Sequence, residues 1–180
     1  MKKLLVPFVI LFVVFCTSCS NQQSGMSDRA KKNLETATAV AKMFESHDWS
    51  KTGDYIAADA VDHSGPRGEV KGLDNIKAQF NEFGNSMSDM KNEVVKEVAD
   101  DEYVFQWMKE SWTQTKDEMG MKAGSKMNMD AIEVSKFNSE GKVTDHWSFI
   151  SMNDMMKMMQ MPQGNMSMDT SKMKMDTTKH

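Results

Sequence analysis

Cysteine, proline and long hydrophobic runs are scarce in this sequence of 180 residues. The two cysteines, Cys16 and Cys19, both lie near the N-terminus, so neither a disulfide nor a cysteine metal site is expected in the rest of the chain. The longest apolar stretch, residues 4–15, is too short to cross a bilayer, which needs about 20 helical residues. A transmembrane helix is therefore not predicted.

An excess of positive charge is also missing, because 22 Lys and Arg stand against 26 Asp and Glu. Binding to nucleic acid needs a cationic surface, so no nucleic-acid partner is expected. The glycine-rich loops of phosphate and dinucleotide sites and the G-x-S-x-G motif of α/β-hydrolases are absent. The four histidines do not have the spacing of zinc ligands, and we expect no cofactor in the domain.

The N-terminus has the pattern of an export signal. Lys2 and Lys3 precede the apolar stretch, and residues 16–20 read Cys-Thr-Ser-Cys-Ser. This resembles the cleavage box of bacterial lipoproteins, with residues 1–18 as signal peptide and Cys19 as the lipidated residue, although Cys16 stands where that box usually carries leucine. The expected location is the cell envelope, anchored to the bacterial membrane on its extracytoplasmic side, with residues 19–27 as a polar tether. A plain secretory signal is the alternative.

The periodicity of residues 28–151 predicts one α+β domain. Helical spacing predicts helices over about 28–47, 51–58 and 73–87, with Ser27 as the first N-cap. Strands are predicted at the ranges that follow: 60–63, 93–99, 103–115, 127–137 and 143–150. Helices followed by an antiparallel meander indicate an α+β fold and argue against alternating βαβ units.

The last 29 residues, 152–180, contain ten methionines and no Val, Leu, Ile or aromatic residue. Such a segment buries too little surface to fold, so we predict a disordered tail with a helical turn around residues 155–161. Met-x-Met-Asp-Thr occurs twice in it, and thioether sulfur is a soft ligand for Cu(I). An alternative function is therefore copper binding through Met166, Met168, Met173, Met175 and His180. A flexible tail that contacts a partner or a membrane is the other interpretation.

Three short stretches carry a resemblance to a known family. They are Val61-Asp62-His63-Ser64-Gly65, then Lys71-Gly72-Leu73-Asp74-Asn75-Ile76, then Gly141-Lys142-Val143-Thr144-Asp145-His146-Trp147. In this order they resemble the SnoaL-like branch of the NTF2-like superfamily, over about residues 28–151. The resemblance implies a cone in which a curved antiparallel sheet wraps around N-terminal helices and an internal pocket. It also implies a small apolar ligand and a homodimer.

One feature of the family's polyketide cyclases is missing. They carry Gly-x-His on the strand before the long connection, where this chain has Ser111-Trp112-Thr113-Gln114-Thr115. The acid/base assignment of the cyclases therefore cannot be transferred to this chain. Cyclase- or isomerase-like acid/base chemistry stays a hypothesis, and whether the protein is an enzyme is left open.

Asp145 and His63 are the candidate catalytic residues. Strict alternation along residues 143–150 places Asp145 with Val143, Trp147 and Phe149 on the more apolar face. If that face lines the pocket, burial would raise the pKa of Asp145 and suit it to acid/base work. His63 could carry a proton near its ordinary pKa of about 6.5. The alternatives are a solvated Asp145 paired with Lys142, and a surface His63.

Aromatic residues in the predicted elements are candidates for a ligand-binding wall. The four chosen are Tyr55, Trp107, Trp112 and Trp147. Large side chains are equally needed for the core of a domain this size. A third interpretation of the chain is therefore an interaction module with a filled core and no ligand.

Overall fold

The structure is a computed structural model that describes residues 25–65, 67–118 and 121–158. Its elements in chain order are α1 (Asp28–Ser46), α2 (Thr52–Tyr55), β1 (Ile56–Asp62), β2 (Val70–Lys71), α3 (Leu73–Ser86), β3 (Met87–Ala99), β4 (Tyr103–Gln114), β5 (Lys126–Phe137), β6 (Val143–Ile150) and α4 (Met152–Met158). The predicted α+β class is confirmed. The strands form one open six-stranded sheet in the order β2-β1-β6-β5-β4-β3.

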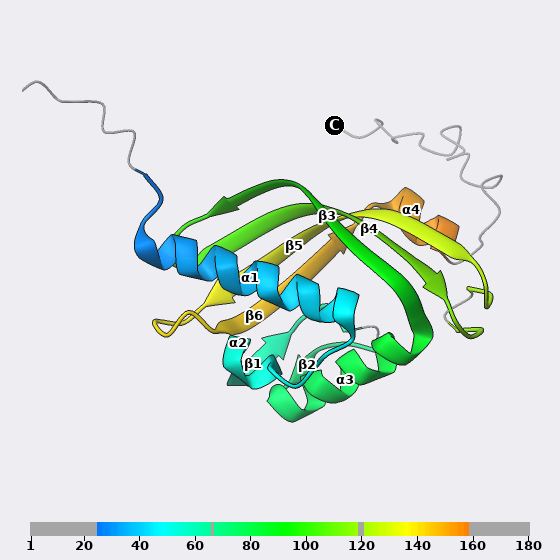
Figure 1. Cartoon of the computed structure of the whole chain (residues 1–180), viewed down its shortest axis with the longest axis horizontal. Helices are drawn as coiled ribbons and strands as arrows, with labels where there is room; N and C mark the ends of the chain where they lie inside the picture. Colours follow the sequence, from blue (N-terminus) through cyan, green and yellow to red (C-terminus); the bar gives the residue numbers. More distant parts are fainter. Residues whose placement is uncertain (1–24, 66, 119–120, 159–180) are drawn as a thin grey trace, which may run out of the picture.

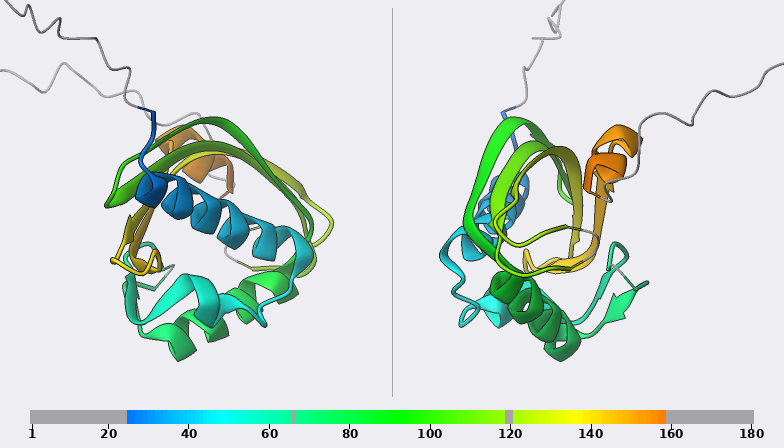
Figure 2. Two further views of the ribbon diagram at one scale, coloured as in Figure 1. Left: turned by 60° about the vertical axis from the view of Figure 1, so that its left-hand side comes forward. Right: turned by 90° about the vertical axis from the view of Figure 1, so that its right-hand side faces the viewer.

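The sheet curves strongly, and helices α1 and α3 lie on its concave side (Figures 1 and 2). Helix α1 packs against β3 and β4, and α3 packs against β1, β2 and the start of β3. Neighbouring strands are antiparallel except β1 and β6, which are parallel, so the predicted antiparallel sheet has one parallel pair. The cone predicted from the family resemblance is thus confirmed.

Breaks in strand pairing produce the curvature. The register of β3 on β4 shifts twice, between Ser88 and Lys91 and between Val94 and Lys96, and Asp89 has a positive φ of 55°. Such bulges bend a strand and increase its twist. The sequence predicted only the second half of β3, from residue 93, whereas the strand begins at Met87.

Helix ends follow local sequence signals. The Ser27 side chain accepts a hydrogen bond from the Ala30 amide at 3.0 Å and so caps α1, as predicted. At the other end, His47 adopts a left-handed conformation with φ 53°. The predicted helix over 51–58 was too long: α2 ends at Tyr55, because Ile56 and Ala57 are buried in strand β1.

The core lies where α1, α3 and the base of the sheet meet. Phe80 packs edge-on against Phe44 with ring centroids 4.7 Å apart, and Trp49 lies 5.0 Å from Phe44. Buried residues of the sheet join this cluster: Ile56, Ala60, Val104, Phe137 and Val143. Phe44 and Phe80 of this cluster also face the space between the helices and the sheet.

Candidate functional site

A cavity of about 360 Å³ lies between the concave face of the sheet and helices α1 and α3. Its volume falls within the range of small-molecule sites, about 300–1,000 Å³. The wall is mainly apolar, with helix residues such as Val40 and Phe44 opposite sheet residues such as Met108, Trp112 and Met129. The core of the domain is therefore not completely filled by side chains.

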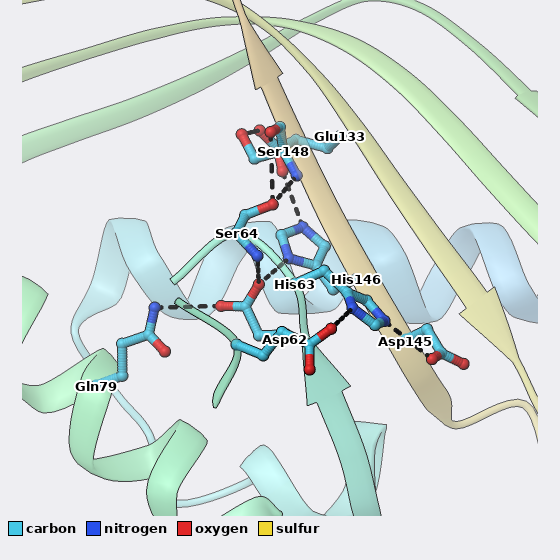
Figure 3. Close-up of polar contacts among 9 residues, drawn as sticks. Asp62, His63, Ser64, Gln79, Glu133, Asp145, His146 and Ser148 are labelled. Atoms are coloured by element: carbon cyan, nitrogen blue, oxygen red, sulfur yellow. Dashed lines mark hydrogen bonds and ion pairs between the residues drawn. The ribbon is translucent and has the colours of Figure 1, made fainter. Parts of the chain in front are cut away.

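Polar side chains form a band along one side of this cavity. Strand pairing sets Asp62 of β1 beside His146 of β6, and Ser148 of β6 beside Glu133 of β5. Because side chains alternate between the faces of a strand, all four point to the concave side. Figure 3 shows them meeting in one hydrogen-bonded cluster.

The His146 ring lies between two carboxylates. Its Nδ1 is 3.2 Å from Asp62 Oδ1, and its Nε2 is 2.8 Å from Glu133 Oε2. A carboxylate only accepts hydrogen bonds, so both ring nitrogens donate and the ring is an imidazolium. Burial alone would lower the pKa of His146, but the hydrogen bonds and negative charges of Asp62 and Glu133 outweigh it and raise the pKa to about 10.

The two carboxylates are held by further partners. Asp62 accepts hydrogen bonds from the Ser64 amide at 3.0 Å and from Gln79 Nε2 at 3.1 Å. Burial would raise the pKa of Asp62, but the hydrogen bond and charge of His146 and these two donors lower it below its ordinary value. Glu133 accepts from the Ser148 hydroxyl at 2.6 Å. The polar groups of the cluster therefore satisfy one another's hydrogen bonds.

Glu110 of β4 is the remaining acidic residue in the cavity wall. It pairs across the sheet with Asn92 of β3 and Met129 of β5, which also line the cavity. Burial and then the negative charge of Glu133 raise the pKa of Glu110 to about 7, although the charge of His146 acts in the opposite direction. Glu110 therefore exchanges a proton near neutral pH, whereas His146 stays charged.

The predicted orientation of the last strand was wrong. Asp145 lies on the convex face, where its Oδ1 is 3.2 Å from His63 Nε2. His63 in turn bonds Glu69 at 2.8 Å and stacks on Trp147 at 4.6 Å between ring centroids. The hydrogen bond to Asp145 is the main cause that raises the pKa of His63. These predicted catalytic residues thus meet each other, but outside the cavity.

Two physical causes explain the reversal. The pairing of β5 and β6 shifts between Lys136 and Phe137, so Val143 and His146 both face the cavity although they are three residues apart. In addition, the convex face is itself apolar, because Trp147 and Phe149 lie on it. The prediction assigned the more apolar of the two alternating sets of residues in 143–150 to the cavity, and that set belongs mainly to the convex face.

Of the four predicted ligand-binding aromatics, Trp112 lines the cavity. Trp107 is two-fifths exposed on the convex face of β4, and Trp147 stacks against His63 on the same side of the sheet. Tyr55 packs against the core cluster beside α2. Strand alternation explains why Trp107 lies outside the cavity. Val104, Gln106 and Met108 point inward, and Phe105 and Trp107 between them point outward.

Other predicted sites fall outside the described residues. These are the lipidation site Cys19 and the copper ligands Met166, Met168, Met173, Met175 and His180. Within the described ranges, no three His, Cys, Asp or Glu side chains are placed to hold a metal ion. None of the helices in those ranges has the length and hydrophobicity of a transmembrane span. Residues 152–158, which we assigned to the tail, form helix α4 beside β5, and Met158 lines the cavity.

Sequence reasoning missed Asp62, Glu110, Glu133 and His146 as cavity residues. Two signals were present: Asp62 precedes His63 in an extended segment where only one can face inward, and His146 lies next to Asp145 in the family-like stretch. Glu110 and Glu133 carried no motif. They are found only from strand register, which aligns Glu133 with Gln106 and Glu110 with Met129.

The sequence model of the SnoaL-like polyketide cyclase family matches residues 34–160. Solved structures share the fold. A SnoaL-like protein from Jannaschia sp. CCS1 superposes with a TM-score of 0.67 at 12% identity, covering 77% of this chain and 98% of its own. A SnoaL-like polyketide cyclase from Agrobacterium tumefaciens gives 0.59 at 13% identity, covering 69% and 95%.

An LEH-like epoxide hydrolase from M. tuberculosis also superposes, with a TM-score of 0.60 at 11% identity, covering 73% of this chain and 91% of its own. None of the curated proteins matches the chain in sequence. At these identities the solved structures support the fold and leave the reaction undetermined, since proteins with different chemistry share it.

Proposed function

The chain belongs to the SnoaL-like polyketide cyclase family, and from this premise we propose that its domain binds a small, mostly apolar molecule in the cavity. The observation that carries the proposal is the hollow of about 360 Å³ with an apolar wall and one polar band. A packed core would have filled such a space, because protein interiors leave few voids larger than a water molecule.

The cavity also determines which residue could serve acid/base chemistry. Both nitrogens of His146 are bonded to carboxylates, and its pKa of about 10 keeps it protonated at neutral pH. Glu110, with a pKa of about 7, is the cavity group able to give and take a proton under these conditions. Any cyclase- or isomerase-like step would therefore use Glu110 in place of the predicted Asp145 and His63.

Contact quenching of tryptophan tests the binding proposal. A bromine atom quenches indole fluorescence only near contact, so 10-bromodecan-1-ol should quench the fluorescence of this protein saturably. Trp112 lines the cavity and Trp107 points outward from the same strand, which supplies a matched pair of variants. W112F should lose the saturable quenching and W107F should keep it. Quenching that survives in W112F, or that never saturates, would refute binding in the cavity.

We propose further that a second copy of this chain covers the convex face of the sheet. The pairing aligns Trp107, Ile132 and Phe149 in one row across β4, β5 and β6, and Phe149 is 56% exposed. With Val98 and Phe105 this makes a contiguous apolar surface, which marks an interface, and a two-fold axis lets one patch serve both partners. Sedimentation should show a dimer that F149E dissociates; a monomeric wild type would refute it.

The N-terminal segment supports a proposed lipid anchor. The pair Ser18-Cys19 follows an apolar stretch of signal-peptide length. Cys19→Ala should move the protein from the membrane to the soluble fraction of the cell envelope, while Cys16→Ala should not. Retention of the Cys19→Ala protein on membranes would contradict lipidation at this residue.

The methionine repeats support copper binding as a second proposed function. Met166 and Met168 recur as Met173 and Met175 in the same Met-x-Met-Asp-Thr pattern. Neutral thioethers favour Cu(I). Titration of Cu(I) against a chromophoric chelator should show sites in the full chain that are lost when the chain ends at residue 158. Equal binding by both proteins would refute the proposal.

A further inference from the structure

Acidic groups outnumber basic groups in the wall of the cavity. Three carboxyl groups line it, those of Asp62, Glu110 and Glu133, against the single imidazolium of His146. In the described part of the chain, no lysine or arginine belongs to the wall. An anion that entered would meet an excess of negative charge in a low-dielectric space, where repulsion is strong.

Both N–H groups of the positively charged His146 ring already have hydrogen-bond partners. Its two N–H groups donate to Asp62 and Glu133, and those carboxylates also accept from Gln79 and Ser148. A ligand anion would therefore have to displace an internal hydrogen bond to reach the one cation. The groups of this cluster bond to one another, so the polar groups that remain available to a ligand lie elsewhere in the wall.

The polar groups that remain available to a ligand are hydrogen-bond acceptors. Glu110 has no hydrogen-bond partner among the described residues, and neither do Gln79 Oε1 and Asn92 Oδ1. The amide orientations are fixed, because Gln79 Nε2 donates to Asp62 and Asn92 Nδ2 donates to the Ala41 carbonyl. Asn92 lies directly opposite Glu110 on the neighbouring strand, so an acceptor and a carboxyl group adjoin each other in the wall.

We infer that the cavity selects amphiphiles with an apolar body and a primary ammonium group, and that Glu110 binds the ammonium. The inference rests on the proposed function and adds the class of ligand to it. An ammonium carries three donors and no acceptor, which matches a carboxylate flanked by an amide oxygen. The apolar body would contact methionines of the wall such as Met108 and Met129, whose flexible thioether side chains adapt to shape.

Binding should depend on pH through Glu110. The titratable groups that act on it are Glu133 of β5 and His146 of β6; Asp62 of β1 lies behind His146. Helices α1 and α3 present neutral side chains to the cavity. Glu45 of α1 is exposed, and its carboxylate accepts a hydrogen bond from the backbone N–H of Asn92. Ionised Glu110 attracts an ammonium and protonated Glu110 does not, so affinity rises as pH passes through about 7.

Competition against 10-bromodecan-1-ol on the full-length protein tests the inference with three probes of one chain length: decylamine, decan-1-ol and sodium decanoate. At pH 8 and physiological salt we expect decylamine to compete at least tenfold more tightly than decanoate, with decan-1-ol between them. The affinity for decylamine should rise by roughly tenfold from pH 6 to pH 8, as expected for linkage to one carboxyl group.

Glu110→Gln keeps the size of the side chain and removes its charge. It should reduce the advantage of decylamine over decanoate and remove the pH dependence of decylamine binding. Exposed Glu93→Gln on β3 is the matched control and should behave as wild type. Decanoate binding as tightly as decylamine to the wild type would overturn the inference. Failure of decan-1-ol to compete would instead overturn the proposed function.

Discussion

We expect Glu110→Gln to change the free energy of unfolding by an amount that depends on pH. Glu110 sits in the apolar wall beside Glu133, and its pKa rises from 4.5 in the unfolded chain to about 7 in the folded protein. The folded state therefore binds the proton more tightly than the unfolded state does. As a consequence, the free energy of unfolding falls as the pH rises from 4.5 to 7, and it recovers none of this loss above 7.

The size of the effect follows from the shift. At about 1.4 kcal/mol per pKa unit, a rise from 4.5 to about 7 makes the ionised carboxylate cost about 3 kcal/mol of stability at pH 8. Glutamine has nearly the same volume and no charge. We therefore expect Glu110→Gln to match the wild type at pH 4 and to be more stable by about 2–3 kcal/mol at pH 8.

Urea unfolding followed by tryptophan fluorescence at several values between pH 4 and pH 8 measures this difference. Glu93→Gln removes an exposed glutamate from β3 and should leave the unfolding curves close to those of the wild type at every pH. A stability difference between Glu110→Gln and the wild type that stays constant from pH 4 to pH 8 would show that folding does not raise the pKa of Glu110 and would refute the reasoning.

Three further predictions concern the two histidine clusters. His146→Asn should lower the free energy of unfolding in urea by about 3–5 kcal/mol, because Asp62 and Glu133 lose the cation between them. Since the pKa of His146 is raised to about 10, its stabilising effect is full below its unfolded value of 6.5 and is lost as pH rises through 10. The gap between wild type and His146→Asn should therefore narrow between pH 7 and pH 10; a constant gap would contradict the assignment. Asp145→Asn on the convex face should change stability by less than about 1 kcal/mol and leave the quenching by 10-bromodecan-1-ol intact, so a loss of quenching in that variant would count against the orientation of β6.

Local sequence signals were sufficient for most of the fold. Ser27 as N-cap and the helical spacing of Leu34, Ala37 and Ala41 located α1 almost to the residue, and the resemblance around residues 141–147 identified the cone. These features depend on neighbours within one turn or one hairpin. The helical turn predicted around residues 155–161 overlaps α4, which begins earlier, at Met152, in the segment assigned to the tail.

The site depended on information that local pattern does not contain. Whether His146 or Asp145 faces inward is decided by one register shift near Phe137, and a shift of one residue exchanges the two faces of the strand. The apolar convex face, with Trp147 and Phe149, removed the contrast that normally marks the buried side. Glu110 and Glu133 come together with residues of β1 and β6 only through long-range pairing.

The most direct measurement is an NMR titration of the full-length protein with decan-1-ol, which has no charge and so reports on the cavity alone. Residues of the concave face, such as Trp112, Met129 and His146, should show saturable shift changes, and Trp107 and Phe149 on the convex face should not. Saturable changes confined to the convex face, or none at all, would contradict a ligand-binding cavity inside the cone.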